Sequence, residues 1–181
     1  MIIWPPTGLR LRLQDLHDTV ASLKTLPTSA SDFTSVALAR YLTVRSAGYL
    51  EAVRDDCADQ YVLKLNTSEQ VLRRVRLNLR TGQGVAPSQL EEFVQSFHPG
   101  WATELGSLLA KDDQTLKSKL GSMVAARKKI AHGDGEQVTT AKALQWADAA
   151  EVIGKWMIER FDPNIPPEAE TPMTIRSSAT V

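Results

Sequence analysis

The stretch ARKKIAHGDG, residues 126–135, ends a long helical pattern that sets the fold class of the chain. Apolar side chains precede and enter it at the three- and four-residue spacing of an amphipathic helix: Leu116, Leu120, Met123, Val124 and Ile130. Gly133 suits the left-handed position that commonly follows a helix, so the spacing predicts a helix that ends at His132. Asp112 or Asp113 is the expected N-cap of this helix.

The same periodicity extends outward from this stretch in both directions. Upstream, a first helix is predicted to begin near Leu9 and to end before Pro27, and a long second helix is predicted from an N-cap at Asp32 to about Leu65. The first two-thirds of the second helix are apolar on nearly every face, which predicts a central helix packed on several sides. Its charged members, Arg40, Arg45 and Glu51, indicate a solvated face, an internal ion pair or support for a nearby site.

Further helices are predicted after these two. Thr67 and Gln70 have the spacing of a capping box for a third helix, and Ser88 and Glu91 have it for a fourth that begins at Pro87. His98 lies in an expected turn without a chemical role. A last helix is predicted from Thr139 or Thr140 to Phe161, with its aromatic side chains in the core.

The composition predicts one soluble domain at residues 1–161 and a flexible, proline-rich tail at 162–181. The formal net charge is zero, so there is no global positive field of the kind that marks many nucleic-acid-binding proteins. The one cysteine, Cys57, and the lack of any long apolar run favour a cytoplasmic protein with no disulfide, no cysteine-rich metal site and no membrane contact. The fold class is therefore predicted as an all-α bundle with a long second helix.

Arg127 and His132 are the side chains in the opening stretch with the most useful chemistry. They lie five positions apart, about 140° around a regular helix, but a loosened helix end allows a long arginine to reach the imidazole. Lys128 and Lys129 make the same turn positive, which favours phosphate. The alternative from the residues alone is structural, because basic side chains and a glycine cap also stabilise any helix C-terminus.

Residues 126–135 resemble the signature of the HEPN superfamily, whose members carry Arg-x(4–6)-His near the end of a late helix. The second helix, with RYLTVRSAGYLE at residues 40–51, is similar to the corresponding pattern of the RiboL-PSP-HEPN branch. The resemblance covers residues from about 8 to 160. It implies an all-α HEPN-like bundle and a metal-independent endoribonuclease, of a toxin or defence-associated type, that needs no cofactor.

The same resemblance implies a homodimer in which two motifs face a shared cleft. Arg127 would hold the scissile phosphate, His132 would act as general acid or base, and Lys128 and Lys129 would contact RNA. Lys128 departs from the family, where a polar residue such as asparagine commonly follows the arginine. This departure leaves open a non-catalytic HEPN module that binds RNA or a partner protein, including an antitoxin or defence-system partner. The arginines at 73–80 either extend the RNA path or form a solvated face.

Overall fold

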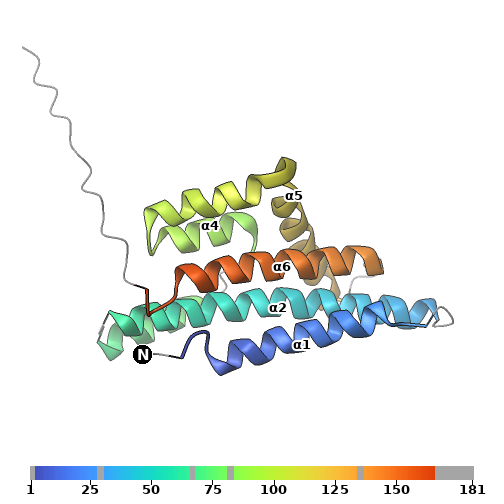
Figure 1. Ribbon diagram of the computed structural model, residues 1–181, viewed down its shortest axis with the longest axis horizontal. Helices are drawn as coiled ribbons and strands as arrows, with labels where there is room; N and C mark the ends of the chain where they lie inside the picture. Colours follow the sequence, from blue (N-terminus) through green and yellow to red (C-terminus); the bar gives the residue numbers. More distant parts are fainter. Residues whose placement is uncertain (1–2, 28–30, 66–67, 81–83, 134–136, 166–181) are drawn as a thin grey trace, which may run out of the picture.

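A computed structural model of the protein describes residues 3–27, 31–65, 68–80, 84–133 and 137–165. Within these ranges the chain forms α-helices and no β-strand, which confirms the predicted all-α class. The helices, shown in Figure 1, are α1 (Thr7–Lys24), α2 (Asp32–Lys64), α3 (Glu69–Arg80), α4 (Pro87–Gln95), α5 (Pro99–Ala131) and α6 (Thr140–Arg160).

Helix α2, 33 residues long, is the element against which most of the others pack. It contacts α1, α3, α5 and α6, and α4 packs on α5. In Figure 1, α1, α2 and α6 run side by side along the long axis of the molecule. Fully buried side chains such as Leu50 and Val53 of α2 and Ile153 and Met157 of α6 form the core between them. Burying such side chains is the main favourable term in the folding of the bundle.

The N-terminal part of α2 carries large apolar side chains that are exposed, although the sequence is apolar on nearly every face there. Phe33 is 82% exposed, Tyr41 50% and Val44 39%. These positions are separated by eight and three residues, so they lie along one side of the helix. The contacts of α2 with α1, α3, α5 and α6 agree with the prediction of packing on several sides, and the side that carries these three residues is open. We call Phe33, Tyr41 and Val44 the α2 apolar stripe.

The starts of α2 and α5 differ from the sequence predictions. The N-cap of α2 is Ser31, whose hydroxyl accepts a hydrogen bond from the Thr34 amide at 3.2 Å, and Asp32 is the first helical residue. The N-cap of α5 is His98, whose Nδ1 accepts from the Gly100 amide at 3.1 Å. His98 therefore has a structural role at a helix start rather than lying in a turn.

Helix α4 begins at Pro87 as predicted, but the expected pair of Ser88 and Glu91 does not cap it. The Gln89 side chain instead reaches back and accepts a hydrogen bond from the Ala86 amide at 3.1 Å. The start of α6 agrees with the prediction, since the Thr139 hydroxyl accepts from the Lys142 amide at 3.3 Å. The expected capping box at Thr67 lies outside the described residues.

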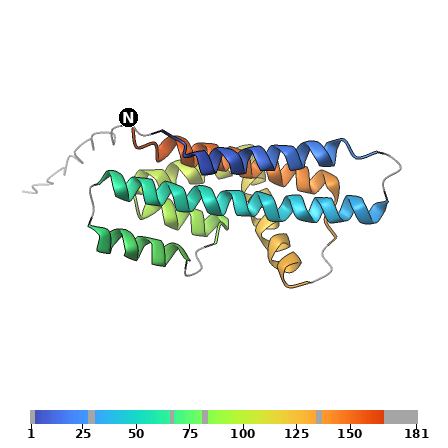
Figure 2. The ribbon, with the colours of Figure 1, turned by 90° about the horizontal axis from the view of Figure 1, so that it is seen from below.

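Helix α5 is interrupted close to the place where a new helix was expected. Lys111 is extended, and Asp112, Asp113 and Gln114 have φ angles of 52°, 54° and 62°. Three consecutive left-handed residues break the helix instead of one aspartate capping a new one. Figure 1 shows that the two halves of α5 run in different directions. The second half contacts α2, and Figure 2 shows that it and α3 lie on the same side of α2.

The chain after α6 remains in contact with the helices as far as it is described. Phe161 and Pro163 are buried, and the Lys64 ammonium donates a hydrogen bond to the Ile165 carbonyl at 2.6 Å. The rest of the predicted tail lies outside the described residues. No helix in the described ranges is both long and apolar enough to cross a membrane.

Candidate functional site

The C-terminal end of α5 brings Arg127 and His132 to the same part of the surface. His132 is the C-cap, and its amide bonds the carbonyls of Lys128 and Lys129 at 3.1 Å. Gly133 follows with a φ of 78°, the left-handed conformation predicted for this position. The Asp134-Gly135 part of the motif lies outside the described residues. The helix thus ends where the sequence predicted, and its last turn carries the basic side chains.

A hollow of about 250 Å³ lies between this helix end, α2 and the segment that leads into α4. Its lining residues come from three parts of the chain: Ala47, Glu51, Gly84, Val85, Val124, Arg127, Lys128 and His132. Cationic side chains and an imidazole therefore share the hollow with one carboxylate and several small apolar groups. The structure brings Arg127, Lys128 and His132 together, whereas Lys129, although on the same turn, does not line the hollow.

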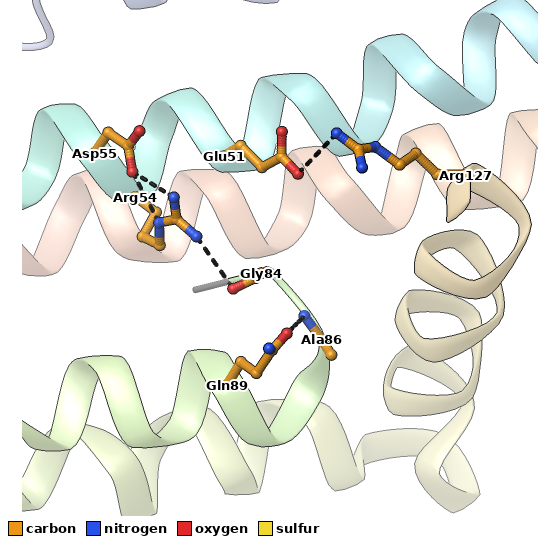
Figure 3. Close-up of polar contacts among 7 residues, drawn as sticks. All are labelled: Glu51, Arg54, Asp55, Gly84, Ala86, Gln89 and Arg127. Atoms are coloured by element: carbon orange, nitrogen blue, oxygen red, sulfur yellow. Dashed lines mark hydrogen bonds and ion pairs between the residues drawn. The ribbon is translucent and has the colours of Figure 1, made fainter. Parts of the chain in front are cut away.

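Glu51 is the ionic partner of Arg127. Its Oε1 lies 3.5 Å from Nη2 of Arg127, and the two side chains are 33% and 41% exposed (Figure 3). A partly exposed pair at this distance contributes at most about 1 kcal/mol to stability. The guanidinium is therefore held loosely at the mouth of the hollow, where an incoming anion can reach it.

Arg54 fixes the segment that forms one wall of the hollow. Its side chain is 4% exposed, and its Nε and Nη2 donate to Asp55 Oδ1 at 2.8 and 2.6 Å. Its Nη1 donates to the Gly84 carbonyl at 3.2 Å, which ties the start of the α4 segment to α2 (Figure 3). Sequence reasoning missed this residue, because nothing in the local pattern around Arg54 indicates a partner 30 positions away.

The wall also depends on the absence of a side chain at Gly84. A Cβ there would lie 2.5 Å from Gln89 Oε1, the atom that accepts the hydrogen bond from Ala86. A side chain at this position would therefore push the amide end of Gln89 aside. Gly84 leaves room for Gln89 to cap α4 beside the hollow.

Two of the other charged residues singled out from the sequence, Arg45 and Arg76, form ion pairs elsewhere. Arg45 pairs with Asp15 of α1 at 2.8 Å, so it is an interhelical ion pair. On α3, Arg76 donates to both carboxylate oxygens of Asp59, a bond that also raises the Arg76 pKa. Arg73 and Arg74 are exposed. A role of α3 in RNA contact stays a prediction.

The arrangement offers anion binding and proton transfer. Guanidinium and ammonium groups hold phosphate oxygens, and imidazole and carboxylate groups exchange protons in water. In the described part of the chain, no three or more His, Cys, Asp or Glu side chains are grouped in a way that would hold a metal ion. The sequence signal for Arg127 and His132 was the motif itself. Glu51 was already one of the charged residues for which an ion pair or support of a nearby site was predicted, but its pairing with Arg127 became visible only in three dimensions. The same holds for the contacts of Arg54 and Gly84.

Comparison of the chain with models of protein families gave no match, and comparisons with curated proteins and with solved structures gave none either. Fold and site therefore rest on the geometry described above.

Proposed function

We propose that the protein is a metal-independent endoribonuclease of the HEPN type. The observation that carries the proposal is that Arg127, Lys128 and His132 line one hollow at the end of α5. The all-helical bundle and the 33-residue second helix are consistent with a HEPN-like domain. The proposal includes a cytoplasmic setting and a toxin or defence-associated role, for which the motif resemblance is the support.

The proposed roles follow from the chemistry of each side chain. Arg127 binds the scissile phosphate through its planar fork of donors and stabilises the charge that develops on it. His132 transfers a proton to or from the reacting oxygens, and the ribose 2′-hydroxyl is the internal nucleophile. Lys128 adds a positive charge beside the phosphate, and Lys129, outside the hollow, supports RNA contact from the same turn.

The proposed active form is a homodimer in which the hollows of two protomers face a shared cleft. Each motif lies at an exposed helix end, which is compatible with such an arrangement. Light scattering after size-exclusion chromatography would measure the mass of the native protein. A protein that stays monomeric in the concentration range in which it cleaves RNA would contradict the dimeric site.

A second candidate is a non-catalytic HEPN module that binds RNA or a partner protein such as an antitoxin. Two observations favour it: Lys128 offers no hydrogen-bond acceptor to orient the site, and the α2 apolar stripe leaves Phe33 82% exposed. Exposed large apolar side chains of this kind commonly mark surfaces that meet other proteins.

Cleavage of labelled single-stranded RNA and tRNA in excess EDTA separates the two candidates. The native protein is expected to cut, and His132→Ala is expected to lose the activity. His17→Ala is the matched control, because His17 is an exposed histidine paired with Glu151 at 3.0 Å and lies outside the hollow. No cutting by the native protein, or equal cutting by His132→Ala, would favour the binding module.

A further inference from the structure

Cleavage of RNA by its own 2′-hydroxyl requires two proton transfers, one from the attacking oxygen and one to the leaving oxygen. The hollow of one protomer holds one imidazole, His132, and that imidazole supplies one of the two transfers. The other transfer, in the reaction of the proposed function, needs a second group. That group has to lie in the same hollow and take the proton from the 2′-hydroxyl.

Only one other side chain that lines the hollow has suitable acid–base chemistry. Arg127 and Lys128 carry positive charge and are donors, which suits them to hold phosphate. Ala47, Val85 and Val124 are apolar, and Gly84 has no side chain. Glu51 remains, a carboxylate that enters from α2 while His132 enters from the end of α5.

The contact between Glu51 and Arg127 is of a kind that a phosphate can replace. Its distance of 3.5 Å is longer than the 2.7 Å of the Arg76–Asp59 pair and the 2.8 Å of the Arg45–Asp15 pair. Charge-assisted hydrogen bonds between a guanidinium and a carboxylate are usually about 2.7–2.9 Å long. Arg127 is therefore the most loosely held of these three arginines.

We propose that Glu51 is the general base of the reaction and that His132 is the general acid. When Arg127 turns from Glu51 to the scissile phosphate, the carboxylate stays in the hollow next to that phosphate. The Glu51 carboxylate takes the 2′-hydroxyl proton, and the 2′-oxygen forms its bond to phosphorus. The bond from phosphorus to the 5′-oxygen breaks, and protonated His132 donates its proton to that oxygen. The products are a 2′,3′-cyclic phosphate and a free 5′-hydroxyl.

The alternative role for Glu51 is structural: its ion pair with Arg127 would only orient the guanidinium. The two roles predict different binding behaviour. Without a competing carboxylate, the Glu51→Gln protein is expected to bind a 2′-deoxy, uncleavable RNA as tightly as the native protein or more tightly. If Glu51 instead orients Arg127 toward the phosphate, the same variant would bind that RNA more weakly. This result would overturn the proposal.

The decisive experiment compares two substrates that differ in their leaving group. One is a dinucleotide, whose alkoxide leaving group needs a proton; the other is the 4-nitrophenyl ester of uridine 3′-phosphate, whose leaving group needs none. On the dinucleotide, Glu51→Gln and His132→Ala are each expected to lower the rate by about 10²–10⁴-fold. On the aryl ester, His132→Ala is expected to recover to near the native rate, whereas Glu51→Gln stays slow.

Glu91→Gln is the matched control, because Glu91 makes a similar loose pair with Lys117 at 3.6 Å and does not line the hollow. It is expected to cleave at the native rate, and circular dichroism would show that all three variants are folded. Glu51→Asp keeps the carboxylate and is expected to retain part of the activity. Cleavage of the dinucleotide by Glu51→Gln at the native rate would overturn the assignment of Glu51 as the general base. Recovery of the Glu51→Gln rate on the aryl ester would overturn it too. Neither result would contradict the proposed function. A native protein inert toward both substrates would overturn the proposed function and this inference together.

Discussion

Replacing Arg54 with methionine is expected to destabilise the protein by about 2 kcal/mol. The native side chain is 4% exposed and makes three hydrogen bonds, two to Asp55 and one to the Gly84 carbonyl. Hydrogen bonds that involve a charged group contribute about 1.5–3 kcal/mol each when both partners are buried. Asp55 is 44% exposed, so water can replace the two hydrogen bonds that its carboxylate loses, which reduces their contribution. Methionine also makes apolar contacts in the space of the arginine side chain. The net loss is therefore close to the contribution of one such bond.

Urea unfolding followed by circular dichroism would measure this loss. For a chain of this size, about 2 kcal/mol corresponds to a fall in Tm of about 4–8 °C. Arg76→Met is the matched control, because Arg76 makes a bidentate bond to Asp59 from a side chain that is 51% exposed. Water screens that pair, so its loss is expected to cost clearly less. Equal losses in the two variants would refute the reasoning that burial makes Arg54 important.

Three further predictions concern other positions in the bundle. Gly84→Ala is expected to lower the free energy of unfolding by about 1 kcal/mol, since the new Cβ would displace Gln89 from its capping bond. An unchanged urea midpoint of unfolding would contradict the close contact between Gly84 and Gln89. Gln114→Gly is expected to raise stability by about 0.5–1 kcal/mol, because the φ of Gln114 is 62° and glycine adopts this conformation without strain. Its control, Ala125→Gly in a regular helical turn, is expected to lower stability by a similar amount. A loss of stability in both variants, measured by thermal unfolding, would refute the left-handed break. Burial, with the Glu151 carboxylate second, raises the pKa of Tyr49 to about 12. The folded state then keeps a proton that the unfolded state loses above pH 10, so this group makes stability fall by up to about 1.4 kcal/mol per pH unit between pH 10 and 12. Spectrophotometric titration would show one tyrosine ionising late, and ionisation of all three tyrosines near pH 10 would contradict it.

The helices could be predicted from the sequence because each one carries its own apolar period. Leu9, Leu16 and Leu23 recur every seven residues, and all three are buried in α1. Pro87 and Thr139 mark helix starts through local chemistry that needs no knowledge of the fold. Arg127 and His132 could be singled out for the same reason, since their spacing and the following glycine are local.

Features that depend on contacts between distant parts of the chain could not be predicted in this way. The pair of Glu51 with Arg127 joins positions on α2 and α5, and it exists because the break in α5 turns the second half of that helix toward α2. The helical period also places Phe33 and Tyr41 on a face of α2 without saying whether another helix covers it. In the structure these two side chains are 82% and 50% exposed, so the described helices leave that face open.

The ends of the RNA fragments test the central claim most directly. Mass spectrometry of the products formed by the native protein in excess EDTA would identify these ends. Attack by the 2′-hydroxyl, with Arg127 on the phosphate and His132 transferring a proton, predicts 2′,3′-cyclic phosphate and 5′-hydroxyl ends. Fragments with 3′-hydroxyl and 5′-phosphate ends, or no fragments at all, would contradict the account.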